Sequence, residues 1–324
     1  MPGPGRSQSR EDLPLSGLRL AVAGPGRVGR SLATWATSAG AELGLVVSRS
    51  ETPREMPPAP GVSFDDIANL PATIEPFDAL LLTIADHALV PVTLSWAESL
   101  RDQPPPFRAV LHTSGSFDSE VLAPLRSVGI AIGSLHPLCA FPHVLPSADS
   151  CRFFAMDGDP EALTVARRLV AAWHGTAHQI SGDRRVVYHL AASLAAGGVV
   201  TLLAAVAELM HRADLPDELL SGYLALLLGA VDVAAESAET DGPRALSTAI
   251  TGPAARDDME TLERHRAALQ TVCPDLLPTV EASWRETLRQ TAPSGQGPAE
   301  TREVAVPTAE TGGSDRPRDT SRSA

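Results

Sequence analysis

The amino-acid sequence contains no lysine, although 26 of its 324 residues are lysine or arginine by composition. Each of these cations is therefore an arginine. A Schiff base, a lysine general acid and a Walker-type phosphate-binding lysine are excluded, because arginine cannot imitate the amine that each of them needs. Arginine instead suits bidentate recognition of carboxylate and phosphate groups.

Positive charge and cysteine are also scarce. The formal net charge is −13 and the pI is near 5.1, and no basic patch interrupts the sequence, so we expect no binding to nucleic acids or anionic membranes. The three cysteines, Cys139, Cys151 and Cys273, form no CxxC pair and indicate a reducing compartment. The polar N-terminal segment lacks the apolar core of a signal peptide, and we expect a cytoplasmic protein.

Metal-binding patterns are scarce as well. One pair of the nine histidines, His174 and His178, has the HxxxH spacing, but both lie in polar surroundings that are typical of solvated side chains. Because the sequence shows no HxH spacing and no clustered carboxylates, we expect no metal site. The composition favours chemistry on a small molecule.

One run of 18 uncharged residues, Leu190 to Ala207, is long enough to be considered as a transmembrane helix. Its high alanine and glycine content, its two hydroxyl residues and the glutamate that follows it argue against membrane insertion. The pattern is apolar nearly all round and is typical of a helix buried in a protein core or a subunit interface. We therefore expect a homodimer built around this helix.

Apolar runs alternate with helical patterns in the first half of the chain, which predicts an α/β fold with a doubly wound parallel sheet of the Rossmann type. The expected strands are Leu18–Ala23, Leu43–Val47, Ala79–Ile84, Ala109–His112 and Ile130–Leu135. A unit of strand Arg152–Met156, helix Pro160–His174 and strand Ala177–Ile180 should complete the sheet.

The sequence becomes entirely helical after Ser181-Gly182-Asp183. The expected helices are a very long one through Arg212, then Leu215–Ala238, Arg256–Thr271 and Leu277–Arg289. We therefore predict a Rossmann domain over 16–181 and an all-helical substrate and dimerisation domain over 182–290. The composition of residues 1–15 and 291–324 predicts disorder.

A glycine-rich motif follows the first expected strand. Gly24-Pro25-Gly26-Arg27-Val28-Gly29 matches GxGxxG and leads into a helical pattern, Arg30 to Ala39. In such a motif the first glycine makes a tight turn, the second lets the backbone approach a pyrophosphate, and the third lets helix and strand pack. The strand, motif and helix together predict a dinucleotide site.

The second expected strand ends in Ser48-Arg49-Ser50, where an NAD enzyme would carry an acidic residue for the ribose 2′-hydroxyl. An arginine between two hydroxyls suits a 2′-phosphate, and we predict NADP(H) as the cofactor. A solvated turn is the alternative interpretation. Further cofactor contacts are expected at the next strand end, at Thr83, Ala85 and Asp86, although Asp86 could equally be a helix N-cap.

Two more strand ends carry polar residues that should face the same cleft, in Leu111-His112-Thr113-Ser114-Gly115-Ser116 and Gly133-Ser134-Leu135-His136-Pro137. Tyr188-His189 opens the long helix, and Thr251-Gly252-Pro253 precedes Arg256. In this order the motifs resemble a bacterial family of Rossmann-like proteins with a C-terminal helical domain of unknown function. That family is related to 6-phosphogluconate dehydrogenase, pyrroline-5-carboxylate reductase and ketopantoate reductase.

The resemblance, which covers about residues 17 to 290, implies NADP-linked reduction and dimerisation through the helical domain. It places Thr113 and Ser114 against the cofactor, with Ser114 also among the catalytic candidates, and Gly115 and Tyr188 against the substrate. The sequence departs from the family pattern at Ala195-Ala196-Gly197, where Ala-Ser-Asn is common. It also departs at Arg256-Asp257-Asp258, where Arg-Gly-Asp is common. A different substrate or a loss of turnover would follow if the missing asparagine orients the substrate.

Reduction of a carbonyl or imine needs a proton donor, and a positioned general acid typically contributes roughly 10²–10⁴-fold. His189 is our first candidate for this acid and His136 the second, while a structural role stays open for each. His112 has the same alternative, as a cap of its strand end. Arg256 is the candidate for binding a substrate carboxylate, unless it forms a salt bridge with a neighbouring carboxylate.

Three functions are compatible with these residues. The leading one is an NADP-dependent oxidoreductase that reduces a small 2-oxo acid of the ketopantoate type or a cyclic imine by hydride transfer. A non-catalytic NADP-binding sensor or partner protein is the alternative, because the usual lysine and asparagine are missing. A helical interaction protein without a nucleotide is disfavoured by the intact glycine motif.

Overall fold

The computed structural model describes residues 13–49, 56–70 and 74–292. The chain forms two compact units, Met1–Val200 and Thr201–Ala324. This division lies further along the chain than the expected boundary after residue 181. The reason is that the helix beginning at Gly182 carries side chains that bond to residues of the sheet.

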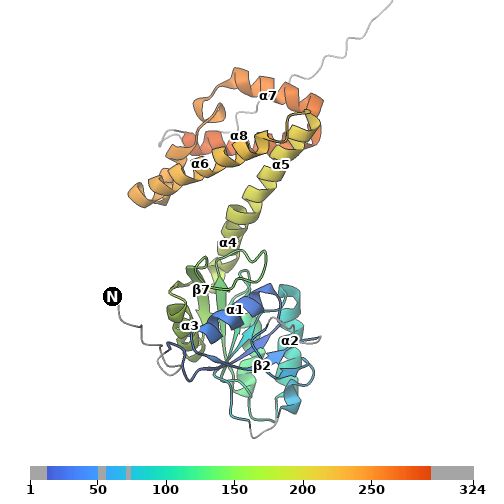
Figure 1. The fold of residues 1–324 in the computed structure, drawn as a ribbon, viewed down its shortest axis with the longest axis vertical. Helices are drawn as coiled ribbons and strands as arrows, with labels where there is room; N and C mark the ends of the chain where they lie inside the picture. The colour runs from blue at the N-terminus through green and yellow to red at the C-terminus, as the bar shows by residue number, and fades with distance from the viewer. Residues whose placement is uncertain (1–12, 50–55, 71–73, 293–324) are drawn as a thin grey trace, which may run out of the picture. The chain divides into compact units, whose positions relative to one another are not determined.

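The first unit contains an eight-stranded sheet in the order β3-β2-β1-β4-β5-β6-β7-β8 (Figure 1). The strands are β1 Arg19–Ala23, β2 Glu42–Val47, β3 Gly61–Val62, β4 Ala79–Leu82, β5 Ala109–His112, β6 Ala131–Pro137, β7 Phe153–Gly158 and β8 Thr176–Gln179. The chain reverses its direction of travel across the sheet between β1 and β4, as in a doubly wound fold. The fold class expected from the sequence is confirmed.

One pair of neighbours, β6 and β7, is antiparallel, whereas the other described pairs are parallel. A parallel connection needs a crossover that is usually helical. The segment between Pro137 and Phe153 contains no helix, so the chain returns directly alongside β6.

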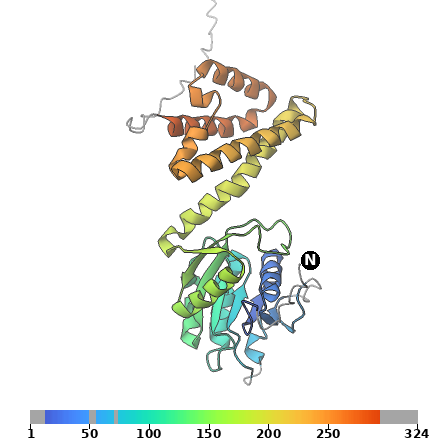
Figure 2. The ribbon, with the colours of Figure 1, turned by 60° about the vertical axis from the view of Figure 1, so that its left-hand side comes forward.

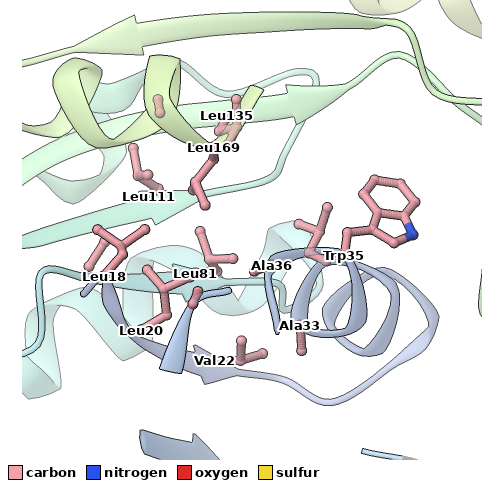
Figure 3. Packing of buried hydrophobic residues seen from close by; sticks show 14 of the residues in the cluster. Leu18, Leu20, Val22, Ala33, Trp35, Ala36, Leu81, Leu111, Leu135 and Leu169 are labelled. Atoms are coloured by element: carbon pink, nitrogen blue, oxygen red, sulfur yellow. The ribbon is translucent and has the colours of Figure 1, made fainter. Parts of the chain in front are cut away.

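Helices cover both faces of this sheet. On one face α1 Arg27–Ser38 and α3 Pro160–Ala172 pack with Leu20, Leu81 and Leu135 of the strands (Figure 3). On the other face α2 Asp86–Ser99 and the 3₁₀ helix η3 Ser119–Val128 pack with alternate strand residues, including Leu80 and Leu82. Because successive strand residues face opposite sides, burial of both faces produces the nearly continuous apolar strands seen in the sequence.

A single long helix follows the sheet. It spans Gly182–Arg212 and consists of α4 Gly182–Ser193, a π-helical turn Leu194–Gly198 and α5 Val199–Arg212. The second unit continues with α6 Leu219–Asp241, α7 Met259–Val272 and α8 Leu277–Thr291 (Figure 2), and with the short helices η5 Pro243–Ala249, η6 Ala254–Arg256 and η7 Pro274–Leu276. The first unit also holds the short η2 Ile67–Asn69.

Within the second unit, α7 and α8 are in contact. Arg266 of α7 bonds to Glu281 of α8 at 2.8 Å. Asp258 caps α7 by accepting the Thr261 amide hydrogen at 3.1 Å. The described residues after 181 therefore form helices, as the sequence predicts.

The apolar surface of the long helix is exposed in the single chain, so that, of the two coverings expected from the sequence, the core of the chain does not supply one and the subunit interface stays a prediction. Val187, Leu190 and Leu194 are 68%, 56% and 62% exposed, and Leu226 of α6 is 70% exposed. By length and composition alone, Gly182–Arg212 and Leu219–Asp241 are both apolar enough to cross a membrane, which by itself is weak evidence. The long uncharged run is not part of the core of one chain.

Candidate active site

The glycine motif forms a tight turn between β1 and α1. Gly24 has a φ of +87°, and its amide donates to the Val47 carbonyl at 2.9 Å. A side-chain carbon on Gly24 would lie 2.7 Å from the Thr83 carbonyl oxygen, and one on Gly29 would overlap Gly24 and Thr83. These two glycines are therefore required by the fold itself, because β1, β4 and α1 approach one another closely here.

Gly26 differs from the other two glycines. A carbon added to it would meet nothing within 4 Å, so the space in front of it is open. Helix α1 begins at the next residue without a side-chain cap and without an acidic residue in its first turn. The backbone amides at this helix start are thus suited to binding a phosphate.

Thr83 has a structural role that the sequence did not predict. Its hydroxyl donates to the carbonyl oxygens of Ala23 and Gly24, at 3.0 and 2.6 Å. This contact fixes the glycine turn against the end of β4. Thr83 nevertheless lines the adjoining pocket, as expected for a cofactor contact.

A pocket of about 640 Å³ opens beside this turn, which is within the size range of ligand sites. Seven residues predicted to bind the cofactor line it: Gly24, Pro25, Gly26, Ser48, Arg49, Thr83 and Ala85. The sequence analysis missed its other wall, which includes Ser63, Phe64, Asp65 and Trp96. Phe64 and Trp96 stack with ring centroids 5.7 Å apart, a contact between distant segments that no local pattern reveals.

Other predicted cofactor residues lie outside this pocket. The exposed Arg27 donates to the Pro142 carbonyl at 3.1 Å. Val28 packs against the core, and Gly29 is buried under the turn. Ser50 lies outside the described residues. Their assignment as cofactor contacts stays a prediction.

A second polar cluster lies where β5 and β6 end, at the same edge of the sheet as the ends of β1 and β4. Helix α4 adds Arg185, Tyr188 and His189 to it, as their contacts below show. The strand ends add Ser114 and His136. Polar residues from three separate segments, more than 70 positions apart at the extremes, are thereby brought together.

The phenol of Tyr188 and the imidazole of His136 are hydrogen-bonded at the centre of this cluster. The distance from His136 Nδ1 to the Tyr188 oxygen is 2.7 Å, and the rings meet edge to face. Burial, together with the charges of Arg185 and His189, lowers the pKa of His136 to about 4. The imidazole is therefore neutral at pH 7, whereas burial raises the pKa of the Tyr188 phenol and keeps it protonated.

His189 also meets His136 edge to face, with ring centroids 5.8 Å apart. Its Nδ1 atom is buried without a hydrogen-bond partner. Both imidazoles lie against Gly115, where an added carbon would be 2.8 Å from His136 Nε2 and would overlap His189 Nδ1. Gly115 is thus the residue that permits the two histidines to approach the strand end.

Ser114 belongs to a chain of hydroxyl contacts that reaches helix α2. Its oxygen accepts the amide hydrogens of Ser116 and Phe117, both at 3.2 Å, and lies 3.3 Å from the Ser116 hydroxyl. Ser116 in turn donates to Asp86 at 2.8 Å. Because Asp86 directly follows the pocket residue Ala85, this chain connects the polar cluster with the pocket beside the glycine turn. Asp86 makes no side-chain cap at the start of α2.

Thr113 and Arg256 complete the predicted set. Thr113 directly follows the last residue of β5, and its amide donates to the Leu82 carbonyl at 3.2 Å. Arg256 is exposed in η6 of the second unit. Within the described residues, no group of three or more His, Cys, Asp or Glu side chains is arranged to hold a metal ion.

Arg185 is the site residue that the sequence analysis missed. It is 0% exposed and bonds through Nη2 to the Ser134 hydroxyl and to the Ser114 carbonyl, the latter at 3.3 Å. Its spacing of three and four residues from Tyr188 and His189 places all three on one helix face. This spacing is the sequence pattern from which Arg185 could have been predicted as a site residue.

The C-terminal part of the chain, which includes α4, matches one protein-family model. Residues 152–291 match the family model of a domain of unknown function, DUF2520, and this range includes α4 with Arg185, Tyr188 and His189. No curated protein matches the sequence significantly.

Solved structures resemble most of the chain. A Bacteroides fragilis protein assigned as an NADP oxidoreductase is 21% identical, with a TM-score of 0.62 over 87% of this chain and 100% of its own. An imine reductase of Myxococcus stipitatus in complex with NADP⁺ is 15% identical, with a TM-score of 0.57 over 84% and 94%. Pyrroline carboxylate reductase of Plasmodium falciparum with NADP bound is 14% identical, with a TM-score of 0.53 over 86% and 100%.

The chain has the fold of NADP-linked reductases. The resemblance expected from the motifs, a Rossmann-like protein with a C-terminal helical domain of unknown function, is confirmed. Sequence identities of 21% and below establish a shared fold. The chemistry of this chain has to be inferred from its own residues.

Proposed function

We propose that this protein is an NADP(H)-dependent reductase of a small imine, in which Tyr188, paired with His136, donates the proton. The observation that carries the proposal is the 2.7 Å hydrogen bond between His136 Nδ1 and the Tyr188 oxygen. It lies at the sheet edge that also bears the dinucleotide pocket. The pocket and a proton donor are the two parts that such a reaction requires.

The described residues fit a dinucleotide. The open space at Gly26 and the uncapped start of α1 suit the pyrophosphate. Arg49 and Ser48 suit a 2′-phosphate, which is why NADP(H) is the proposed form. Bound NADPH would supply a hydride.

The protonation states favour Tyr188 as the donor. Neutral His136 has one ring hydrogen, and if that hydrogen is on Nδ1 it is donated to the Tyr188 oxygen, which leaves the phenol hydrogen free for a substrate nitrogen. As Tyr188 loses its proton, the same Nδ1–H bond stabilises the negative charge that develops on oxygen. His189, our first candidate for the acid from the sequence, has no hydrogen-bond partner at Nδ1 that could stabilise a change of its charge in this way.

The distribution of arginines favours an imine over a 2-oxo acid. Arg185, the arginine within the polar cluster, is fully buried, and its Nη2 already bonds to Ser134 and Ser114. A substrate that needs one hydrogen-bond donor at nitrogen matches the Tyr188 phenol better than one that needs an exposed cation.

The test replaces Tyr188 by Phe and measures NADPH oxidation with a panel of cyclic imines and 2-oxo acids. We expect kcat to fall about 10²–10⁴-fold, as for loss of a general acid, while calorimetry shows unchanged NADPH binding. Tyr223→Phe is the matched control, because Tyr223 of α6 is the other of the two tyrosines.

Each other outcome assigns a different role. Full turnover in Tyr188→Phe together with its loss in His189→Gln would make His189 the acid. NADPH binding by the unaltered protein without turnover of any substrate would favour the non-catalytic sensor. Failure to bind any dinucleotide would contradict both functions.

A further inference from the structure

Arg185 is a buried cation without an ionic partner. The side chain is 0% exposed, and its Nε and Nη1 atoms are buried without hydrogen-bond partners. Of its nitrogens, Nη2 makes the two bonds to Ser134 and Ser114. Burial lowers the pKa of Arg185, but a guanidinium in a protein stays protonated.

The carboxylates that act on this cation or on the neighbouring histidines are bonded elsewhere. Asp157 accepts from the Ser119 amide and hydroxyl, at 3.0 and 2.8 Å. Asp86 accepts from Ser116, and Asp118 accepts from the Glu120 amide. Among the described residues none forms an ion pair with Arg185 within 4.0 Å.

A buried charge without a partner destabilises a fold, so its position is informative. The guanidinium carbon lies 5.8 Å from the centroid of the Tyr188 ring. A fixed positive charge at that place lowers the energy of a phenolate in the same ring, because it is oriented before the charge develops. It also disfavours a proton on the neighbouring His136 and His112.

We propose that Arg185 is a positioning residue that stabilises the negative charge left on Tyr188 when its proton is donated, and that it adds to the effect of burial in keeping His136 neutral. The kinetic part of this inference rests on the proposed function. The electrostatic part concerns only the ionisation of Tyr188 and holds for the resting protein.

Other charged groups act on Tyr188, on the neighbouring histidines or on Arg185 itself, and they oppose or assist the effect of Arg185. Asp86 at the start of α2 favours protonation of His136 and His112, and Asp157 of β7 favours protonation of His112. His189 of α4 disfavours protonation of His136. Asp157 and Asp118 favour the charged form of Arg185. Burial, and to a smaller extent Cys151, raise the pKa of Tyr188, whereas Arg185 lowers it. Removal of Arg185 should therefore raise the pKa of this phenol further.

Tyr188 can be titrated by itself, because the chain has two tyrosines and Tyr223→Phe leaves it as the sole reporter. In this background the tyrosinate absorbance is followed against pH for Arg185→Gln, Arg185→Lys and Arg184→Gln. Arg184 precedes Arg185 on α4 and is exposed, so its variant removes the same charge without touching the cluster.

We expect Arg185→Gln to decrease the ionisation constant of Tyr188 roughly tenfold or more, a rise of at least one pKa unit. Arg185→Lys should restore much of the difference, and Arg184→Gln should titrate as the parent does. An unchanged Tyr188 titration in folded Arg185→Gln overturns the inference. If Arg185→Gln does not fold, Ser134→Ala, which removes one bond that orients the guanidinium, must shift the Tyr188 titration in the same direction.

Steady-state kinetics form the second arm of the experiment. With an imine substrate, Arg185→Gln should lower kcat roughly 10²-fold, about 2.7 kcal/mol, with NADPH affinity unchanged and partial recovery in Arg185→Lys. A shifted titration without turnover in any variant, the parent included, would refute the proposed function and leave the electrostatic inference standing. A shifted titration with unchanged kcat in an active parent would refute the catalytic part.

Discussion

The imidazole of His112 has a structural role that can be assigned from its bonds. Its Nε2 lies 2.9 Å from the Asp118 carbonyl, and its Nδ1 accepts the Ser114 amide hydrogen at 3.2 Å. Burial lowers its pKa to about 4, so the ring is neutral at physiological pH. The sequence left open whether His112 caps the strand end, and these two bonds support that interpretation over catalysis.

Arg49 provides the sharpest test of cofactor choice at the scale of one residue. Arg49→Asp should raise the Kd for NADPH about tenfold to a hundredfold, the loss expected for charge-assisted hydrogen bonds of 1.5–3 kcal/mol. The Kd for NADH should change far less, because NADH has no 2′-phosphate. Calorimetric titration with both cofactors measures the difference.

The control for that experiment is Arg101→Asp, which makes the same charge change at an exposed position after α2. It should leave both dissociation constants near their starting values. Equal weakening of NADPH and NADH in Arg49→Asp would refute a contact between Arg49 and the 2′-phosphate.

Single residues were predictable from sequence where a short motif defines their surroundings. Gly24, Gly26 and Arg49, predicted to bind the cofactor, line one pocket because strand, turn and helix are consecutive there. Arg185 could not be identified in the same way. Its burial depends on Ser134 and Ser114, which are 51 and 71 positions away in the chain.

At the scale of elements, the glycine turn separates stability from ligand binding. Gly29→Ala should lower the free energy of unfolding by several kcal/mol, because a carbon there overlaps backbone and Thr83 atoms that cannot move apart cheaply. Gly26→Ala should leave the stability unchanged, since its carbon meets nothing within 4 Å, yet it should weaken NADPH binding. Denaturant unfolding and calorimetry measure the two effects.

This pair of variants contains its own control, since both add one methyl group to the same motif. Loss of stability in Gly26→Ala would contradict the open space described at that residue. Unchanged NADPH binding in a folded Gly26→Ala would contradict the approach of a pyrophosphate to this turn.

The strands were predicted within a few residues, because buried parallel strands form short, continuous apolar runs. The antiparallel direction of β7 was not predicted. Alternation of apolar runs and helical patterns indicates which elements exist, whereas direction depends on the connection. Here the connection between Pro137 and Phe153 lacks the helix of a parallel crossover. β3 was missed because it has only two residues, Gly61 and Val62.

At the scale of the whole molecule, the exposed apolar residues of the long helix and α6 support the homodimer that we expected from sequence. Single chains rarely keep large apolar patches in water. We expect light scattering to give twice the chain mass of 33.9 kDa. Leu226→Glu, on the 70%-exposed Leu226, should shift the protein toward the monomer, because it places a charge in an apolar interface.

Glu239→Arg supplies the comparison, as it changes an exposed polar position on the same helix. It should leave the mass unchanged. A monomer that remains soluble without detergent would contradict the dimer, and extraction from cells only with detergent would indicate a membrane and contradict the cytoplasmic location as well.

The overall organisation was predictable because composition changes visibly along the chain, from strand-rich to helical. The exposure of the long helix in the single chain was not predictable, since an apolar helix has the same sequence whether its own chain, a second copy or lipid covers it. The compact units also divide later than residue 181. The side chains that hold α4 to the sheet, Arg185 and Tyr188, make contacts at long sequence separation.

The placement of the two halves of the site has an evolutionary consequence. The dinucleotide pocket is formed by the segments from β1 to α2, and the Tyr188 cluster by β5, β6 and α4. The hydroxyl chain from Asp86 to Ser114 connects the two. Selection can therefore alter the substrate by changing α4 and the ends of β5 and β6 while the nucleotide turn is inherited intact.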